Sequence, residues 1–179
     1  MNRRIVVVIS TVVLSLCTGW SAHAANVEYT VSDPFVSDSG GTLLPVDSLV
    51  WLINAGGDTM SDFDSLTRAA MADDVVVDMR AIGAGILPFL PRDGRISTSV
   101  NTGAVSNGDW LYLVAFNATD AVAATEIGLS TLLQFNGGDT GVATLTFPGF
   151  STAAVVPEPA SFALLGSAVI LLAVRRRRG

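Results

Sequence analysis

The side chains that could do chemistry in the middle of this chain are almost all carboxylates. The sequence holds one Cys and one His, Cys17 and His23, and it has no Lys. A Ser or Cys nucleophile needs a neighbouring base, and zinc, copper and haem prefer imidazole or thiolate ligands. Residues 25–156 therefore lack the groups on which most catalytic and metal sites are built. We expect no catalytic residue, no enzymatic activity and no cofactor.

Calcium is the one ion that the remaining side chains would suit, because it prefers oxygen ligands. Asp58, Asp62 and Asp64 follow the Gly56-Gly57 turn and are the calcium candidates. Their spacing does not match the Asp-x-Asp-x-Asp-Gly loop of an EF-hand. The alternative is that these acids keep exposed loops soluble.

Paired acids could also hydrolyse glycosides, and the neighbouring pairs Asp62/Asp64 and Asp73/Asp74, together with Asp78, are the candidates by proximity. Such enzymes need a large cleft lined with aromatic side chains. Trp51 and Trp110 could stack on sugar rings, but each lies in a run that is apolar on both faces, which favours the core. The sequence therefore disfavours a carboxylate hydrolase.

The charge of the middle segment excludes one class of partner. Residues 25–156 carry four arginines against fifteen carboxylates, a balance of −11. Because so acidic a surface repels phosphate backbones, we expect no nucleic-acid binding.

Short apolar runs separated by Gly, Asn, Asp and Pro predict an all-β fold for this segment. The surest strand covers residues 109–117, which are apolar on both faces, and residues 48–54 suit a central strand for the same reason. In residues 74–82 the alternation places Val75, Val77 and Met79 on one face. Further strands are expected at residues 26–31, 95–100, 126–135 and 142–147.

Residues 61–72 could interrupt the all-β pattern. Ser61 could cap a helix, and Phe63, Leu66 and Ala70 recur at helical spacing, so the segment is either one short helix or a long loop. Strand–helix–strand alternation does not recur. The best fold is a single β-sandwich-like ectodomain at residues 25–156, with seven or eight strands.

The first 24 residues have the three parts of a secretory signal peptide. Arg3 and Arg4 precede a twelve-residue apolar run, and Ala22-His23-Ala24 supplies the small–x–small pattern for cleavage before Ala25. The run is too short to span about 30 Å of hydrocarbon comfortably, which favours a cleaved signal. The expected partners are the secretion translocon and signal peptidase.

The C-terminal residues 157–179 have an equally distinct order. Pro157, Glu158 and Pro159 keep the backbone extended, residues 160–174 form an apolar run that predicts a transmembrane helix, and a basic cluster follows. Cationic residues stay on the cytoplasmic side, so the domain would lie outside. The cluster consists of Arg175, Arg176, Arg177 and Arg178.

This order closely resembles the PEP-CTERM sorting signal of Gram-negative bacteria, over roughly residues 156–179. The resemblance implies recognition by exosortase, a multi-pass membrane protease or transpeptidase, with the span holding the protein in the inner membrane until it is cut away. It also implies delivery to the cell surface or extracellular matrix and association with exopolysaccharide or biofilm. The alternative is a carbohydrate- or calcium-binding adhesion module that the C-terminal helix anchors permanently.

Overall fold

The computed structural model describes residues 24–137 and 141–155. The predicted transmembrane helix, the Pro157-Glu158-Pro159 motif and residues 1–23 of the predicted signal peptide lie outside these ranges. Within them the regular elements are all strands, so the all-β prediction is confirmed. A helix able to cross a membrane is not found in the described ranges.

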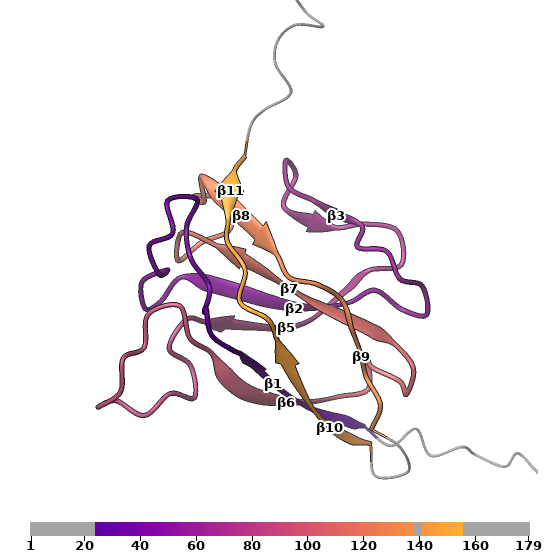
Figure 1. The fold of residues 1–179 in the computed structure, drawn as a ribbon. Helices are drawn as coiled ribbons and strands as arrows, with labels where there is room; N and C mark the ends of the chain where they lie inside the picture. Colours follow the sequence, from indigo (N-terminus) through magenta and orange to yellow (C-terminus); the bar gives the residue numbers. More distant parts are fainter. Residues whose placement is uncertain (1–23, 138–140, 156–179) are drawn as a thin grey trace, which may run out of the picture.

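The strands form two main sheets and one small hairpin (Figure 1). The three-stranded sheet has the order β10-β1-β6, in which β1 lies parallel to β10 and antiparallel to β6. The large sheet has the order β11-β8-β7-β2-β5, with β9 paired to β7. The bounds are β1 Ala25–Val31, β2 Leu49–Asn54, β3 Phe63–Asp64, β4 Ala69–Ala70, β5 Val75–Ala81, β6 Ser97–Thr102, β7 Trp110–Phe116, β8 Glu126–Leu129, β9 Leu133–Gln134, β10 Val142–Phe147 and β11 Ala153–Ala154.

The main core lies between the two sheets. Along β1 every second side chain is buried, which is the period of two expected of a strand with one face on a core. These side chains meet Val50 and Leu52 of β2 and Leu111 and Leu113 of β7 in one cluster. Two sheets that share one core are the β-sandwich that the sequence predicts.

A second cluster covers the opposite face of the large sheet. Ile53, Tyr112, Val114 and Phe116 face this cluster, and the loop after β7 adds Ala121 and Ala124. Because both faces of β7 are covered, its residues from Leu111 to Phe116 are all buried. This explains why residues 48–54 and 109–117 are apolar on both sides, as the sequence analysis expected for central strands.

The short helix considered for residues 61–72 is absent from the structure. Phe63 of β3 pairs with Ala70 of β4 in a small hairpin, and both pack on the second cluster. The turn needs a left-handed backbone at Arg68, with φ of 56°, and Ala72 has φ of 53°. The helical spacing of Phe63 and Ala70 instead reflects two positions that face each other across a hairpin.

The expected alternation in residues 74–82 is wrong because β5 contains a bulge. Leu52 pairs with Asp78 but Ile53 pairs with Val76, so Val77 is an extra residue in the ladder. Val77 packs on the main core and Val76 on the second cluster, whereas Met79 is exposed. Val75, Val77 and Met79 therefore do not share one buried face.

The strand predicted over residues 126–135 is also two strands rather than one. β8 ends at Leu129 and β9 begins at Leu133, and both pair with β7. Between them the Ser130 hydroxyl accepts a hydrogen bond from the Leu113 N–H at 2.8 Å, so the side chain replaces a ladder partner where the strand breaks.

Candidate functional site: the C-terminal end and the domain surface

The chain that leads to the predicted sorting motif is fastened to the sandwich up to Val155. The Ser37 N–H donates to the Phe150 carbonyl at 3.1 Å, and the Thr152 N–H donates to the Ser37 carbonyl at 2.8 Å. β11 then pairs with β8, and the Val155 N–H donates to the Thr125 carbonyl at 2.9 Å. The described chain is therefore fastened to the sandwich to within two residues of Pro157.

Glu126 holds this last segment through its carboxylate. One carboxylate oxygen accepts a hydrogen bond from the Thr152 hydroxyl at 2.7 Å and one from the Ser39 N–H at 2.9 Å, and the other accepts the Ser39 hydroxyl at 2.7 Å. These donors, the Thr152 hydroxyl first, hold the pKa of Glu126 below its ordinary value. The Glu126 side chain therefore joins three parts of the domain: β8, the turn at residues 38–41 and the C-terminal segment.

Gly128 allows the C-terminal segment to lie close to β8. A Cβ atom there would come within 2.6 Å of the Ser151 carbonyl oxygen and 2.9 Å of the Thr152 Cα. Contacts this short between a Cβ and backbone would force the segment away. The absence of a side chain at Gly128 is therefore a condition for docking β11.

The residues of the predicted processing sites lie at the edges of the structure or beyond them. β1 begins at Ala25, which is buried, and Ala24 is exposed just before it. Ala22, Pro157, Glu158 and Pro159 lie outside the described residues, and so does the arginine cluster at residues 175–178. The structure therefore shows the folded body that ends next to each predicted cut.

The calcium candidates mostly stabilise local turns. Asp58 accepts the Met60 N–H at 3.0 Å, and Asp64 accepts the Leu66 N–H at 2.8 Å and the Thr67 hydroxyl at 2.7 Å. The Thr67 hydroxyl and then the Leu66 N–H lower the pKa of Asp64. Among the described residues, no three Asp, Glu, His or Cys side chains are grouped so that they could hold a metal ion.

The paired acids Asp73/Asp74 differ in exposure, because Asp73 lies at the surface and Asp74 does not. Asp74 is buried, and one of its oxygens accepts hydrogen bonds from the Tyr112 hydroxyl and from the Asp62 N–H. Burial raises the pKa of Asp74 and is the largest cause of its shift. Burial, followed by the Asp74 carboxylate, also raises the pKa of Tyr112 above its ordinary range. This arrangement fastens residues 61–74 to β7.

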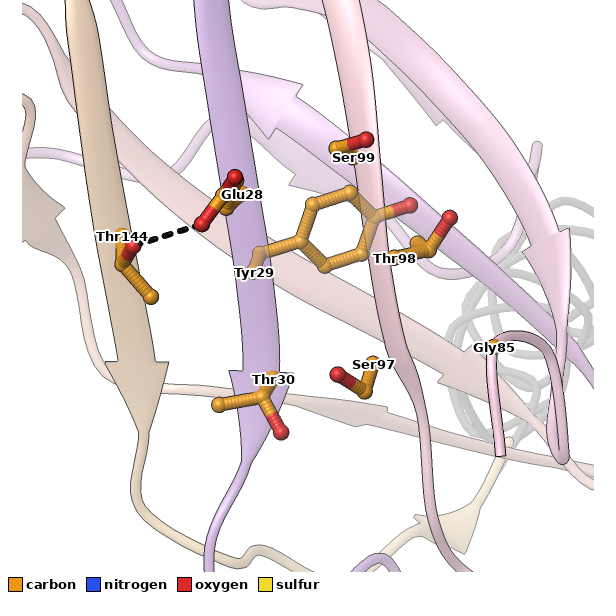
Figure 2. Close-up of a pocket in the computed structure, with 8 residues that line it drawn as sticks. All are labelled: Glu28, Tyr29, Thr30, Gly85, Ser97, Thr98, Ser99 and Thr144. Atoms are coloured by element: carbon orange, nitrogen blue, oxygen red, sulfur yellow. Dashed lines mark hydrogen bonds between the residues drawn. The ribbon is translucent and has the colours of Figure 1, made fainter. Parts of the chain in front are cut away.

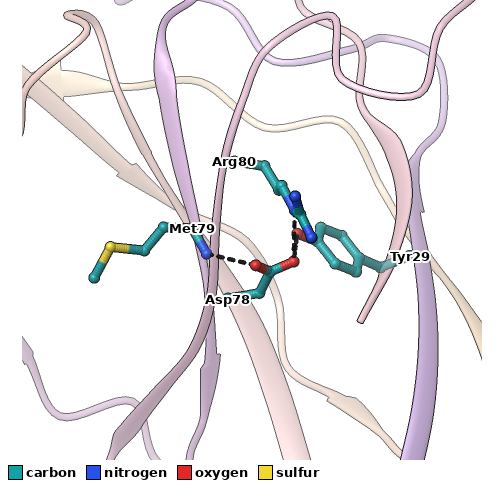
Figure 3. Close-up of polar contacts among 4 residues, drawn as sticks. All are labelled: Tyr29, Asp78, Met79 and Arg80. Carbon is teal, nitrogen blue, oxygen red and sulfur yellow. Dashed lines mark hydrogen bonds and ion pairs between the residues drawn. The ribbon is translucent and has the colours of Figure 1, made fainter. Parts of the chain in front are cut away.

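A polar network that the sequence analysis missed joins the two sheets. The Tyr29 hydroxyl of β1 donates to Asp78 Oδ2 of β5 at 3.0 Å, and the Arg80 Nε–H donates to the same oxygen at 2.9 Å (Figure 3). Asp78 Oδ1 accepts the Met79 N–H at 2.9 Å, while the Met79 side chain points away from the network. Burial and then Asp78 raise the pKa of Tyr29 above its ordinary range. This contact could not be predicted from the sequence, because the bulge in β5 that determines which way Asp78 points has no sequence pattern of its own.

A shallow polar hollow lies on the outer face of the three-stranded sheet. Its volume is about 340 Å³. Glu28 pairs across the sheet with Ser99 and Thr144, and the Thr144 hydroxyl donates to the Glu28 carboxylate at 2.9 Å (Figure 2). Thr30 and Ser97 continue the same face. Hydroxyl groups and one carboxylate can exchange hydrogen bonds with a hydroxylated ligand.

The two tryptophans of the domain pack against the second cluster, as expected. Trp51 lies 4.9 Å from Phe116 and 6.2 Å from Phe63 between ring centroids. These contacts place Trp51 in an aromatic group with Phe63 and Phe116. The tryptophans therefore serve packing in the described structure.

Comparison with known proteins identifies one feature of the chain. The family model of the PEP-CTERM protein-sorting motif matches residues 155–178, which confirms the resemblance found in the sequence. The match begins at Val155, the last residue that the structure describes. No curated protein and no solved structure matches the chain. The motif supports export of the chain and its sorting by exosortase.

Proposed function

We propose that this chain is a non-enzymatic exported protein that exosortase releases from the inner membrane to the cell surface or extracellular matrix. In this proposal the signal peptide is removed before Ala25, residues 160–174 hold the chain in the membrane, and exosortase cuts near Pro157-Glu158-Pro159. The arginines at 175–178 keep the tail on the cytoplasmic side. The observation that carries the proposal is the sorting-motif match at residues 155–178.

The structure supports separate roles for the domain, which is folded, and for the tail, which exosortase would recognise. β11 ends at Ala154, and the described chain is fastened by hydrogen bonds as far as Val155. The two prolines of the motif disfavour helix at this boundary and keep the backbone extended. The proposal therefore gives an enzyme at the membrane face an extended segment to recognise next to the described domain.

The test is the intact mass of the protein recovered from the outside of its native cells. We expect a species that begins at Ala25 and ends near Val156 or Pro157. A species in the membrane fraction that still ends at Gly179 would contradict removal of the tail, and it would support the permanently anchored adhesion module instead.

For the released domain we infer association with extracellular polysaccharide, and the hollow on the outer face of β10-β1-β6 supports it. The hollow presents hydroxyl groups beside one carboxylate, which suits a hydroxylated and uncharged chain. The acidic balance of the domain disfavours polyanions. Extracellular polysaccharide from the native cells should retain the domain in a pull-down.

Ser99→Arg would fill part of this hollow with a bulky side chain and should abolish retention, whereas Thr59→Arg adds the same charge at an exposed position away from the lining residues. Equal retention of the two variants would contradict the assignment of the hollow. Failure of the unchanged domain to bind would contradict the polysaccharide association itself.

A further inference from the structure

At one end of the sandwich, two loops lie around the last described residue of the C-terminal segment, Val155. The Arg68 guanidinium donates to the Leu66 carbonyl at 3.0 Å and to the Ala124 carbonyl at 3.0 Å, so it joins the β3–β4 turn to the loop after β7. Val155 bonds to Thr125, the next residue of that loop. We call this surface, made of residues 65–68, 120–125 and 155, the exit face.

The exit face carries two exposed apolar side chains. Val122 is 76% exposed and Leu66 is 44% exposed, and Ala123 beside Val122 is exposed too. Figure 1 shows β11, the start of β8 and the turn after β3 together at the top of the view, where the C-terminal segment leaves. The connection from β5 to β6 lies at the lower left of the same view, well away from them.

The length of the tail limits how far the exit face can lie from a membrane. Between Val155 and Ala160, where the apolar run begins, there are four residues. Five Cα-to-Cα steps span at most about 18 Å when fully extended. Polar headgroups occupy about 5–8 Å of that distance on each side of the hydrocarbon. The end of the folded domain is therefore held within roughly 10 Å of the headgroups.

We propose that the exit face lies against the lipid surface while the chain is anchored, with Val122 and Leu66 in contact with the headgroup region. This proposal rests on the proposed function, because the tail must enter the membrane. The exit-face segments and the residues next to them in the sequence carry the acids Asp64, Asp120 and Glu126 against one arginine, Arg68, so the face fits a zwitterionic rather than an anionic surface.

The apolar loop at residues 87–91 supplies the matched control. Phe89 is 79% exposed, slightly more than Val122, and exposed Leu87 and Leu90 flank it. If exposure of apolar side chains alone decided which part touches lipid, this loop would be the contact. The tail length assigns the contact to the exit face instead.

The experiment uses the full chain with Cys17→Ser, which removes the single native cysteine. Single variants Val122→Cys, Leu66→Cys and Phe89→Cys are labelled with an environment-sensitive fluorophore and reconstituted into phosphatidylcholine vesicles. Flotation shows whether residues 160–174 insert. Quenching by lipids with a doxyl group near the headgroup then reports which label reaches the interface, because interfacial side chains lie about 5–10 Å deep at the acyl boundary.

We expect the labels at positions 122 and 66 to be quenched about twofold more than the label at position 89, since only the exit face is held at the interface. In chain that floats, equal or stronger quenching at 89, or none at 122 and 66, would overturn the proposal. Chain that does not float with the vesicles would contradict the membrane segment of the proposed function, and the exit-face contact would fall with it.

Discussion

At the scale of single residues, this domain uses its acids as structural ligands for its own chain. Asp78 receives three donors, from Tyr29, Met79 and Arg80, and Glu126 receives three from Ser39 and Thr152. Carboxylates that accept several hydrogen bonds are fixed in place and are less free to act on a ligand. The same acidic side chains that led us to expect no nucleic-acid binding therefore also hold the fold together.

Asp78→Ala should lower the free energy of unfolding by about 1–3 kcal/mol, because it leaves the buried Tyr29 hydroxyl without its acceptor. Urea unfolding of Asp78→Ala, Tyr29→Phe and the double variant would measure the coupling between the two side chains. Additive effects of the two single changes would contradict this role of the hydrogen bond.

The contribution of Glu126 to stability should depend on pH. Its pKa is lowered in the folded state, so the stability it adds is present above its unfolded pKa of about 4.3 and is lost as pH falls through the folded pKa. Urea unfolding should therefore show Glu126→Gln less stable than the unchanged chain at pH 7, with the two converging as pH falls below the folded pKa. A difference that stays constant down to pH 2 would contradict the carboxylate as its source.

Calcium at millimolar concentration should leave the thermal unfolding temperature unchanged. The Asp58 and Asp64 carboxylates already accept backbone N–H groups in their own turns, and no metal-ligating group of three is found in the described residues. A ligand that binds the folded state would raise the unfolding temperature with its concentration. A rise that Asp62→Asn removes would show that calcium does bind there.

At the scale of elements, the predictions from sequence were good where burial alone decides the structure. Residues 109–117 are apolar on both faces, and β7 covers 110–116 because it lies centrally between two cores. The helix considered at residues 61–72 is not formed, because Phe63 and Ala70 pair in a hairpin and pack on the same cluster. The spacing of these two residues in the sequence is the same in a helix and in such a hairpin, so it does not distinguish the two structures. The bulge at Val77 had no sequence signal.

In the candidate site, too, some features could be predicted from the sequence and others could not. The sorting motif is a linear pattern, so it could be predicted from roughly residues 156–179, and the family model matches residues 155–178. The fastening of β11 joins Ser39, Glu126 and Thr152, which lie up to 113 residues apart in number, so only the structure shows it. The parallel pairing of β1 with β10 is equally non-local.

Gly128→Ala should weaken the docking of β11, because the new Cβ would meet the Ser151 and Thr152 backbone. We expect a loss of about 1–3 kcal/mol in the free energy of unfolding, typical of an overpacked site. Gly103→Ala is the matched control, since a Cβ there meets nothing within 4 Å. If urea unfolding gave the two variants the same free energy of unfolding, the contact of the new Cβ with the Ser151 and Thr152 backbone would not be the cause of the loss.

At the scale of the whole molecule, the β-sandwich is followed by the sorting motif, which begins at Val155. The body requires no group from the tail among the contacts described, and the tail requires no fold to carry its motif. Processing should therefore depend on the tail, while stability should depend on the sandwich.

Deletion of residues 160–178 should abolish C-terminal processing and membrane retention without unfolding the domain. The expected product is an exported chain whose mass shows every residue up to Pro159 followed by Gly179, found in the soluble fraction. Mass spectrometry of the cell fractions would check this. Processing and location that remain unchanged after the deletion would contradict the role of the tail as a sorting signal.

The parallel pairing of β1 and β10 also sets the order of events during export. β1 crosses first, but it stays with one edge open until Val142–Phe147 has followed it, because β10 is its parallel neighbour. Pairing at so large a separation in sequence makes folding slow and late. The apolar run begins at Ala160, soon after Phe147. In the proposed route of export, the smaller sheet should therefore close at about the time when residues 160–174 enter the translocation channel.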